Sequence, residues 1–367
     1  MLKIGNLITN AQNAILNLMI KNKYAWVLSD LDKVEKNGFT VFSTFACGGG
    51  SSMGYKRAGF TIVGANDIDP QMRKHYEKNL KPKIFIQAPI KDLLKMDLPE
   101  ELFNLDILDG SPPCSSFSMS GNREKDWGKE KHFKEGQAVQ ILDDLFFDFL
   151  EVGNKLKPKV IIAENVKGLV AGNAKGYLKE IFNKLNEMGY RPQVFLLNAA
   201  FCGVPQRRER VFICAVRNDV SDVKLKLQPF EKEITVGEAT NDLINIPNTA
   251  YYPDKENLWF KYWSATKPGD NFTKAYAKYN PGKNGWFNHV KHTPYKSSPT
   301  ITAGGTNGHW DEPRYLTPME LIRIGSFPDD YWFENNAMPK YLIGMSVPPK
   351  MTELVANAVL NTWLKKD

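Results

Sequence analysis

Residues 40–54 read Thr-Val-Phe-Ser-Thr-Phe-Ala-Cys-Gly-Gly-Gly-Ser-Ser-Met-Gly, an apolar run that ends in a glycine cluster. The run Thr40–Phe45 is typical of a buried strand, and a helical pattern follows the glycines. Glycine lets the backbone approach a ligand closely at such a turn. The spacing of Gly48, Gly50 and Gly54 is not Gly-x-Gly-x-x-Gly, and no Gly-Lys-Ser/Thr follows to make a P-loop. The stretch predicts a nucleotide-type turn between a strand and a helix, although a generic tight turn would also explain the glycines.

Outward from this turn, short apolar runs alternate with helical stretches. The strand-like runs are Thr40–Phe45, Thr61–Ala65, Ile84–Ile86, Leu105–Leu108, Val160–Ala163, Val194–Leu197 and Val211–Val216. Helical patterns cover Val139–Leu156, Tyr177–Met188 and Met351–Lys365. Such alternation is typical of a doubly wound α/β sheet, in which ligands bind beyond the strand ends. The sequence therefore predicts a doubly wound, Rossmann-like α/β fold.

An acidic residue closes the second strand-like run. Asp67 follows Asn66, about twenty residues beyond the glycines. An acid at this place accepts hydrogen bonds from ribose hydroxyls in dinucleotide-binding folds. The glycine turn and Asp67 together predict an adenosine-containing cofactor, without identifying which one.

Composition places the chain among ordinary globular proteins. The chain has 367 residues, which suits one large domain and a smaller one, and its net charge of +7 permits a nucleic-acid partner without requiring one. The four cysteines form no C-x-x-C pair and the five histidines are scattered, so we expect neither a disulfide framework nor a metal site. We find no membrane-length apolar run and no signal peptide, which favours a reducing, cytoplasmic location.

The pattern divides the chain into four parts. Residues 1–38 predict a helical N-terminal extension, because Leu7, Ala11, Ala14, Ile15, Leu18 and Met19 recur at helical spacing. Residues 39–217 carry the strand–helix alternation. Residues 218–313 are rich in Asn, Pro, Lys and aromatic residues and predict a smaller, irregular domain. Residues 314–367 return to regular structure and end in a helix.

The irregular domain combines basic and aromatic side chains. Between Lys255 and Lys296 there are eight lysines and ten aromatic residues, against the acids Glu256 and Asp270. Lysines interleaved with aromatic residues suit a nucleic-acid surface. The alternative is that the aromatic residues form the core of this domain and the lysines its solvated face. Sequence alone leaves both interpretations open.

A cysteine follows the fourth strand-like run. Pro112 and Pro113 fix the backbone just before Cys114. A lone cysteine is usually a small core residue, but the polar, glycine-bearing stretch 115–136 that follows favours a thiol exposed at a pocket rim. That stretch could act as a lid.

Charged side chains border the next two strands. Glu164 and Asn165 follow the run Val160–Ala163, and a partly desolvated carboxylate there can act as an acid, whereas a surface or capping acid is the alternative. Arg207, Arg208 and Arg210 precede the run Val211–Val216, which suggests an anionic ligand or, alternatively, a solvated face with local ion pairs.

Taken together, these blocks resemble the DNA cytosine-5 methyltransferase family. The resemblance rests on F-A-C-G-G-G-S-S-M-G, N-D-I-D, P-P-C, E-N-V, Q-R-R-E-R, R-Y-L-T-P-M-E and G-M-S-V-P-P in this order. It covers roughly residues 40–217 and 299–360. The irregular stretch 218–313 includes the place where this family carries its variable target-recognition domain.

The resemblance implies a class I methyltransferase fold with a mixed sheet, and S-adenosylmethionine as methyl donor without a metal. Cys114 would attack C6 of a flipped-out cytosine, Glu164 would contact N3 and the exocyclic amine, and Asn165 would shape that pocket. Arg208 and Arg210 would steady the base and the adjacent phosphate. The residues implied to hold the cofactor are Phe45, Cys47, Gly48, Gly49, Gly50, Asp67, Ile68, Ile90, Pro112, Ser346 and Val347.

The chain departs from the family pattern at several positions. Ser43 stands where the glycine loop usually begins with an acid, and Cys47 stands where glycine is usual. Pro89 occupies the place of an aspartate that binds the adenine amine, with Asp92 close by but out of register. Further on, Ser115 replaces a common glutamine and Met345 replaces a usual asparagine.

The implied partner is double-stranded DNA. Residues 218–313 contain no arginine, the commonest reader of guanine, so we expect readout by lysine, asparagine, backbone groups and the turn Thr302–Asn307. The expected DNA contacts are Ser118, Ser120, Thr302, Gly304 and Gly305. We expect a monomeric modification enzyme of a prokaryote or phage, paired with a restriction endonuclease. The alternatives are a tRNA cytosine-5 methyltransferase and a catalytically silent DNA-binding relative.

Overall fold

The computed structural model describes residues 22–113, 130–131, 140–141, 145–171, 174–229, 232–243 and 252–365. Cys114, Ser118, Ser120 and the helical spacing at 7–19 lie outside the described residues.

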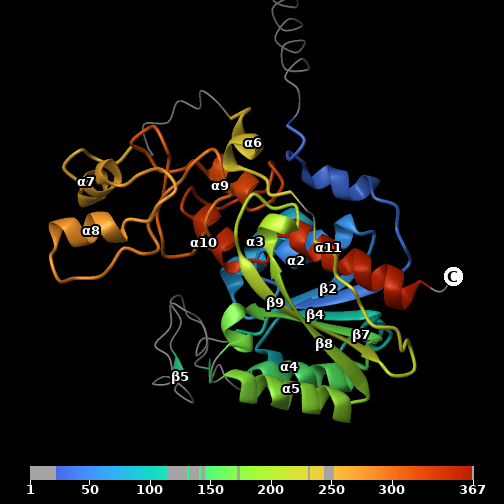
Figure 1. Ribbon diagram of the computed structural model, residues 1–367. Coiled ribbons are helices and arrows are strands. Elements are labelled where there is room, and N and C mark those ends of the chain that lie inside the picture. Colours follow the sequence, from blue (N-terminus) through green and yellow to red (C-terminus); the bar gives the residue numbers. More distant parts are fainter. Residues whose placement is uncertain are drawn as a thin grey trace, which may run out of the picture.

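The predicted doubly wound α/β sheet is confirmed. One seven-stranded sheet has the order β3-β2-β1-β4-β7-β9-β8 (Figure 1). Its strands are β1 (Thr40–Thr44), β2 (Thr61–Asp67), β3 (Phe85–Gln87), β4 (Ile107–Gly110), β7 (Val160–Val166), β8 (Tyr190–Asn198) and β9 (Glu209–Arg217). Strands from β3 to β7 pair in parallel, and β9 is antiparallel to both β7 and β8. The sheet is therefore mixed, as the resemblance implies.

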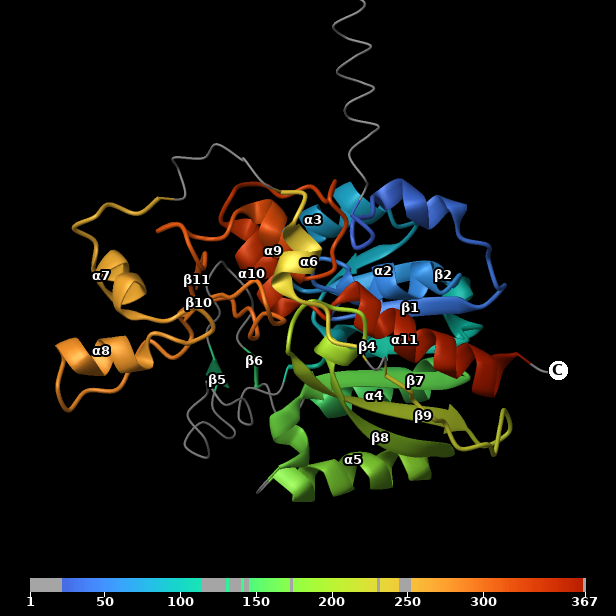
Figure 2. The ribbon, with the colours of Figure 1, turned by 45° about the horizontal axis from the view of Figure 1, so that its top comes forward.

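Helices cover both faces of this sheet (Figures 1 and 2). The large domain contains α2 (Gly50–Arg57), α3 (Pro70–Leu80), α4 (Leu145–Leu156), α5 (Lys175–Glu187) and α11 (Pro349–Val359). Alternate residues of each strand enter different clusters, as the period of two in a strand requires. Phe42 and Leu108 pack with α4 and α5, whereas their neighbours Val41 and Ile107 pack with α2 and α11.

A third cluster joins the N-terminal segment to helices from the C-terminal part. These helices are α6 (Val236–Thr240), α9 (Pro318–Ile324) and α10 (Met338–Met345). Trp26 is buried in this cluster, and its Nε1 donates to the Ser326 carbonyl at 3.0 Å. The described part of the predicted N-terminal helices contains only a 3₁₀ turn, η1 (Leu28–Lys33).

The aromatic residues of the irregular domain form its core. The helices α7 (Leu258–Ala265) and α8 (Thr273–Tyr279) protrude on one side, next to the short pair β10 (Val290–Lys291) and β11 (Asn307–Gly308) (Figure 2). Trp259, Tyr262, Trp263, Phe272 and Ala275 form the buried cluster there. This supports the core interpretation for the tryptophans, while the exposed lysines lie around them.

Several element boundaries differ from the sequence prediction. Glu164 and Asn165 lie inside β7 rather than after it, because β9 pairs with them through Phe212 and Val211. The helix expected from Val139 is described only from Leu145. Residues 140–141 instead form the short strand β6 (Gln140–Ile141), which pairs with β5 (Glu130–Lys131). The last helix continues from α11 as one π-helical turn, Leu360–Leu364. Within the described ranges, no helix is long and apolar enough to cross a membrane.

Candidate active site

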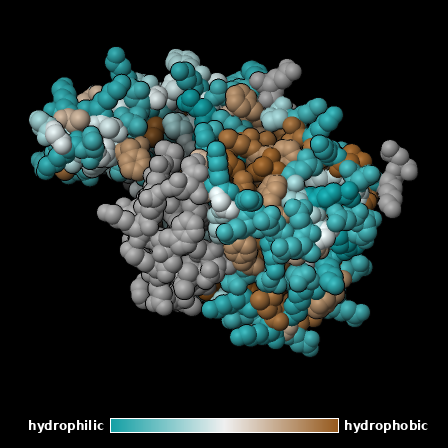
Figure 3. All heavy atoms as spheres, turned by 60° about the horizontal axis from the view of Figure 1, so that its bottom comes forward, coloured by the Kyte–Doolittle hydropathy of each residue, from teal (hydrophilic) through white to brown (hydrophobic). Residues whose placement is uncertain are grey.

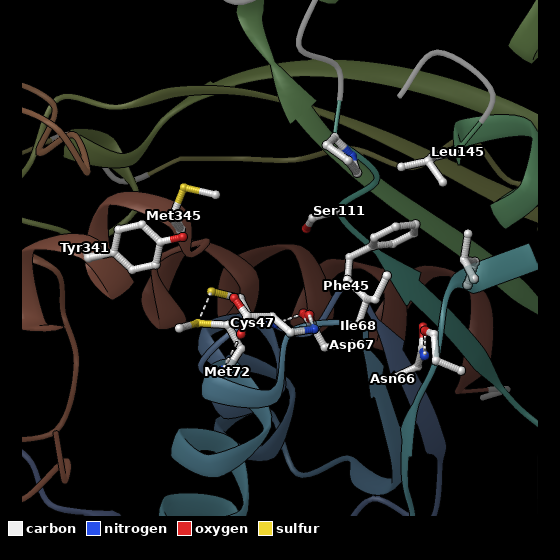
Figure 4. Close-up of a pocket in the computed structure, with 14 residues that line it drawn as sticks. Phe45, Cys47, Asn66, Asp67, Ile68, Met72, Ser111, Leu145, Tyr341 and Met345 are labelled. Atoms are coloured by element: carbon white, nitrogen blue, oxygen red, sulfur yellow. Dashed lines mark hydrogen bonds between the residues drawn. The ribbon is translucent and has the colours of Figure 1, made fainter. Parts of the chain in front are cut away.

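A pocket lies beyond the carboxyl ends of β1, β2, β3 and β4 (Figure 4). It combines apolar side chains, an acidic edge and sulfur atoms. Its lining residues are Phe45, Cys47, Asn66, Asp67, Ile68, Asp69, Met72, Ala88, Ile90, Ser111, Pro113, Leu145, Tyr341 and Met345. The position matches the ligand-binding edge of doubly wound sheets.

The glycine loop that follows Cys47 packs closely against α10 and the residues after it. A Cβ on Gly50 would lie 2.1 Å from the Val347 carbonyl oxygen, and one on Gly48 would lie 2.5 Å from Leu342. Gly49 has φ +83° and caps α2. The side-chain hydroxyl of Tyr331 donates to the Gly48 carbonyl at 2.7 Å. Glycine is therefore required here by space and by conformation.

Asp67 connects the glycine loop to the turn before α3. Its carboxylate accepts from the Cys47 N–H at 2.8 Å and from the Asp69 N–H at 2.9 Å. Burial raises the pKa of Asp67 to about 6, although these two N–H donors oppose the rise. The side chain is placed at the pocket wall, where a ribose hydroxyl could donate to it.

The backbone leading to Cys114 is tied to the neighbouring strand. Asn165 donates from Nδ2 to the Pro112 carbonyl at 3.1 Å. Asn165 is almost fully buried, and Pro113 lines the pocket. The predicted cytosine-pocket residue Asn165 thus holds the two prolines that precede Cys114.

A buried ion pair lies at the end of β7. Arg210 Nε and Glu164 Oε1 are 2.8 Å apart, and both side chains are largely buried. Burial lowers the pKa of Arg210, and the negative charge of Glu164 opposes this effect. Burying a charge pair of this kind costs desolvation free energy, and buried charged groups with shifted pKa values are candidates for a functional role.

Arg208 has a different environment from Arg210. It is 2% exposed, and its two Nη atoms donate to the carbonyls of Ile301 at 3.2 Å and Gly344 at 2.9 Å. Both Nη atoms therefore bind backbone, whereas the buried Nε has no partner among the described residues, and the predicted contact of Arg208 with base or phosphate stays a prediction. Arg208 ties the turn that begins at Thr302 to α10.

The turn expected to contact DNA is held at its base and open at its tip. Thr302 Oγ1 accepts from the Gly305 N–H at 3.1 Å. A Cβ on Gly305 would lie 2.2 Å from the Asn288 carbonyl oxygen, whereas Gly304 is exposed with no atom near its Cβ position. Gly344 packs against Ala303, which brings the turn beside the Met345 edge of the pocket.

The acid missing at Ser43 is present on the adjacent strand. Ser43 and Asp109 are paired in register between β1 and β4, and the Ser43 hydroxyl donates to Asp109 Oδ2 at 2.9 Å. The Tyr55 hydroxyl donates to Oδ1 at 3.1 Å. Burial, together with the smaller effect of the Glu164 charge, raises the pKa of Asp109 to about 7, although the two hydroxyl donors oppose the rise.

Asp109 should make stability depend on pH. Its folded-state pKa of about 7 lies above the ordinary value of 3.8, so the folded state retains a proton that the unfolded state has lost. Stability therefore falls as pH rises between about 4 and 7, by about 1.4 kcal/mol for each unit of difference. In urea denaturation at pH 5 and pH 8, we expect Asp109→Asn to gain stability relative to the unsubstituted protein at the higher pH. A difference that is the same at both pH values would contradict this.

The structure brings together only part of the predicted cofactor set at the pocket surface. Phe45, Cys47, Asp67, Ile68 and Ile90 line the pocket. The remaining predicted residues are not among its lining: Gly48, Gly49 and Gly50 form the loop, Ser346 and Val347 pack against Cys47 and Gly50, and Pro112 binds Asn165. Sequence reasoning missed Met72, Leu145 and Tyr341 as wall residues, since they come from α3, α4 and α10 without a motif. The apolar spacing along these helices is the only sequence signal that could have found them.

The chain matches known proteins over most of its length. Residues 39–361 match the family model described as C-5 cytosine-specific DNA methylase. The type II methyltransferase M.NgoFVII of Neisseria gonorrhoeae is 31% identical over 343 residues, which is 87% of this chain and 86% of the relative. The type II methyltransferase M.Eco47II of Escherichia coli is 29% identical over 360 residues, which is 90% and 81% of the two chains.

Solved structures share the fold. A prophage-encoded DNA modification methyltransferase of Escherichia coli superposes with a TM-score of 0.62 at 21% identity, covering 89% of this chain and 99% of the other. DNMT2 of Spodoptera frugiperda gives a TM-score of 0.59 at 19% identity, covering 87% and 98%. The fold is thus that of these methyltransferases. With the family model and the 31% identical relative, these matches show that the chain belongs to the C-5 cytosine-specific DNA methylase family and is a DNA cytosine-5 methyltransferase.

Proposed function

We propose that this chain is the modification enzyme of a type II restriction–modification system, and that it methylates one cytosine within a short duplex sequence. The names of its relatives support this, since both M.NgoFVII and M.Eco47II are type II methyltransferases. The observation that carries the assignment of roles is the buried Glu164–Arg210 pair beside the Asn165–Pro112 bond. The enzyme would act on DNA in the cytoplasm of a prokaryote, and its gene would belong to the prokaryote or to a phage.

The pocket residues fit S-adenosylmethionine. Asp67 offers a carboxylate for the ribose, and Phe45, Ile68, Ile90 and Leu145 offer an apolar surface for a flat base. Gly50 leaves no room for a Cβ against the Val347 carbonyl, and a Cβ on Gly48 would displace the Leu342 side chain of α10. When bound, the cofactor supplies a methyl group activated on a sulfonium. No cluster of metal-ligating side chains occurs in the described part of the chain.

The reaction needs groups that activate the cytosine ring. C5 of cytosine is a weak nucleophile, and addition of the Cys114 thiolate at C6 makes C5 enamine-like. Glu164 bearing a proton would donate to N3 and so offset the negative charge of the ring. Once C5 has formed its bond to the methyl group, the C5 proton is lost and the thiolate is eliminated from C6, which leaves 5-methylcytosine and the free Cys114 thiolate. Since these atoms are hidden inside a stacked duplex, the base must first be flipped out.

Sequencing of treated DNA tests this function directly. Mixed-sequence duplex is incubated with the protein and S-adenosylmethionine, and enzymatic conversion then identifies protected cytosines. We expect protection within one short motif. Protection of cytosine in tRNA but not in duplex DNA would instead favour the tRNA substrate. No methylation of either, with DNA binding retained, would favour a silent DNA-binding relative.

We further propose that the protruding α7–α8 segment binds DNA phosphates. Residues 258–283 carry five lysines and one acid, Asp270, which is +4 of the total charge of +7. Lys274 and Lys278 are exposed one turn apart on α8, an arrangement that destabilises an isolated helix by like-charge repulsion. Among the described residues neither has an acidic partner. The space-filling view shows the corresponding lobe as mainly hydrophilic (Figure 3).

Charge removal on α8 should reduce the salt dependence of DNA binding. For K274Q/K278Q we expect the slope of log K against log salt to fall by about 0.9 for each lysine that contacts a phosphate. The matched control K224Q/K226Q removes the same charge from exposed lysines beside Val223. The Val223 carbonyl accepts from Trp363 Nε1 close to the C-terminus, which lies on the opposite side of the molecule from α8 (Figure 1). Equal slopes for both variants would argue against this surface. The preferred target sequence should not change.

A further inference from the structure

Asn66 is a buried side chain whose carbonyl oxygen has no protein donor among the described residues. It lies at the end of β2, is 1% exposed and lines the cofactor pocket. Its Nδ2 donates to the carbonyls of Ile86 at 2.8 Å and Ala88 at 2.9 Å. A carboxamide nitrogen carries two hydrogens, so both donors are used. In the described parts of the chain no donor reaches Asn66 Oδ1.

The two bonds of Nδ2 also fix the orientation of the amide. Oxygen cannot donate to the Ile86 or Ala88 carbonyls, so the nitrogen must face β3 and the oxygen must face away from it. A buried acceptor without a partner costs free energy unless a ligand or water donates to it. Because Asn66 lines the pocket, its open oxygen is available to an N–H or O–H group of a bound ligand.

The neighbours of Asn66 define which ligand group comes near. Asp67, the next residue, is the candidate ribose acceptor, and Phe45 and Ile68 lie beside it in the pocket (Figure 4). A base attached to that ribose would extend along the apolar side chains toward Ala88 and Ile90. Adenine carries an exocyclic amine that needs an acceptor there.

Other side-chain acceptors around the base slot are used or absent. Pro89, which stands between Ala88 and Ile90, has no polar side chain and no N–H. Asp69 caps α3 through the Gln71 N–H at 2.8 Å, and Asp67, which accepts from two N–H groups, is assigned to the ribose. Asn66, next to Ala88 in the pocket lining, offers a side-chain acceptor to which no donor is bound among the described residues.

We infer that Asn66 Oδ1 accepts the hydrogen bond of the adenine amino group and so selects adenine in the cofactor. The inference rests on the proposed use of S-adenosylmethionine. It gives the chain an amine acceptor on β2, although Pro89 supplies none. Asn66 would then bind the carbonyls of Ile86 and Ala88 through Nδ2 and the adenine amino group through Oδ1.

Equilibrium binding of two ligands tests this role. The probes are S-adenosylhomocysteine and its 6-deamino analogue, in which the purine carries hydrogen at C6. One neutral hydrogen bond corresponds to a preference of about 5- to 10-fold, so we expect the unsubstituted protein to favour adenine by this factor. Asn66→Ala should lose the preference, by weakening S-adenosylhomocysteine binding more than analogue binding.

Asn79→Ala is the matched control. Asn79 is also buried and its Nδ2 also donates to two carbonyls, those of His75 and Trp332, but it does not line the pocket. We expect it to lose stability and keep the adenine preference. If Asn66→Ala weakens both ligands equally and keeps the preference, Asn66 is only structural and the inference is wrong. If the unsubstituted protein binds neither ligand, the cofactor assignment itself fails, and the inference with it.

Discussion

Serine in place of Cys114 is expected to abolish methyl transfer while DNA and cofactor binding persist. A neutral hydroxyl does not add to C6 of cytosine, so the covalent step is lost and the rate should fall by about 10⁴-fold or more. Single-turnover transfer of labelled methyl groups to a duplex that carries the target measures this loss. Retained DNA binding would show that the variant is folded.

The other cysteines support the choice of Cys114 as nucleophile. The thiolate is the reactive form, and burial raises the pKa of Cys47 and of Cys202 to about 12. Burial raises the pKa of Cys214 still further above its ordinary value. These three thiols therefore hold almost no thiolate at neutral pH. Cys114, which lies outside the described residues, is the remaining candidate.

A covalent trap separates this chemistry from a structural effect. Fluorine at C5 of the target cytosine cannot leave as a proton does, so the adduct between thiol and C6 should persist after methyl transfer. We expect a denaturation-resistant complex with the unsubstituted protein and none with Cys114→Ser. Cys202→Ser is the control, because a serine there can still donate to the Asn198 carbonyl, as the thiol does at 3.4 Å. An adduct on Cys114→Ser would overturn the assignment.

The strand-end motifs were predictable from sequence because parallel strands place their carboxyl ends at one edge. Phe45, Asp67 and Pro113 meet at one pocket for this reason. Asp109 was not predictable as the partner of Ser43, since the strand register that pairs them is a property of the folded sheet. The same holds for Arg208, whose partners Ile301 and Gly344 lie 93 and 136 residues away.

The irregular domain was harder to interpret because its aromatic residues have no helical or strand period. Trp259 packs on Tyr315 with ring centroids 4.5 Å apart, a contact that brings the segment after residue 313 into the core of the smaller domain. Composition alone cannot separate a stacking surface from a core when both are rich in tryptophan. What distinguishes them is burial, which only the folded structure gives.

Glutamine in place of Glu164 is the second large effect that we expect. The carboxamide oxygen of the E164Q variant could still accept from Arg210 Nε, which Glu164 holds at 2.8 Å, so folding and base binding should survive. A carboxamide can place its amine toward N3 but cannot transfer a proton to it. Loss of an acid in this role typically costs about 10²- to 10⁴-fold in rate. We therefore expect E164Q to lower the single-turnover rate by that factor with little change in DNA affinity.

The neighbouring carboxylate Glu209 provides the control for E164Q. Glu209 lies on β9 beside Arg210 in sequence, but it is exposed and pairs with Lys167 at 2.9 Å on the surface. An exposed pair of this kind contributes little to stability, so E209Q should keep its methylation rate.

If E164Q and E209Q were equally active, the carboxylate of Glu164 would serve only to neutralise buried Arg210, and proton donation to the ring would have to come from another group. If E164Q instead lost rate and DNA affinity together, the ion pair would be needed to form the base pocket. Only a loss of rate at constant affinity assigns Glu164 to the chemistry, because that step is where a proton, rather than a hydrogen-bond acceptor, is required.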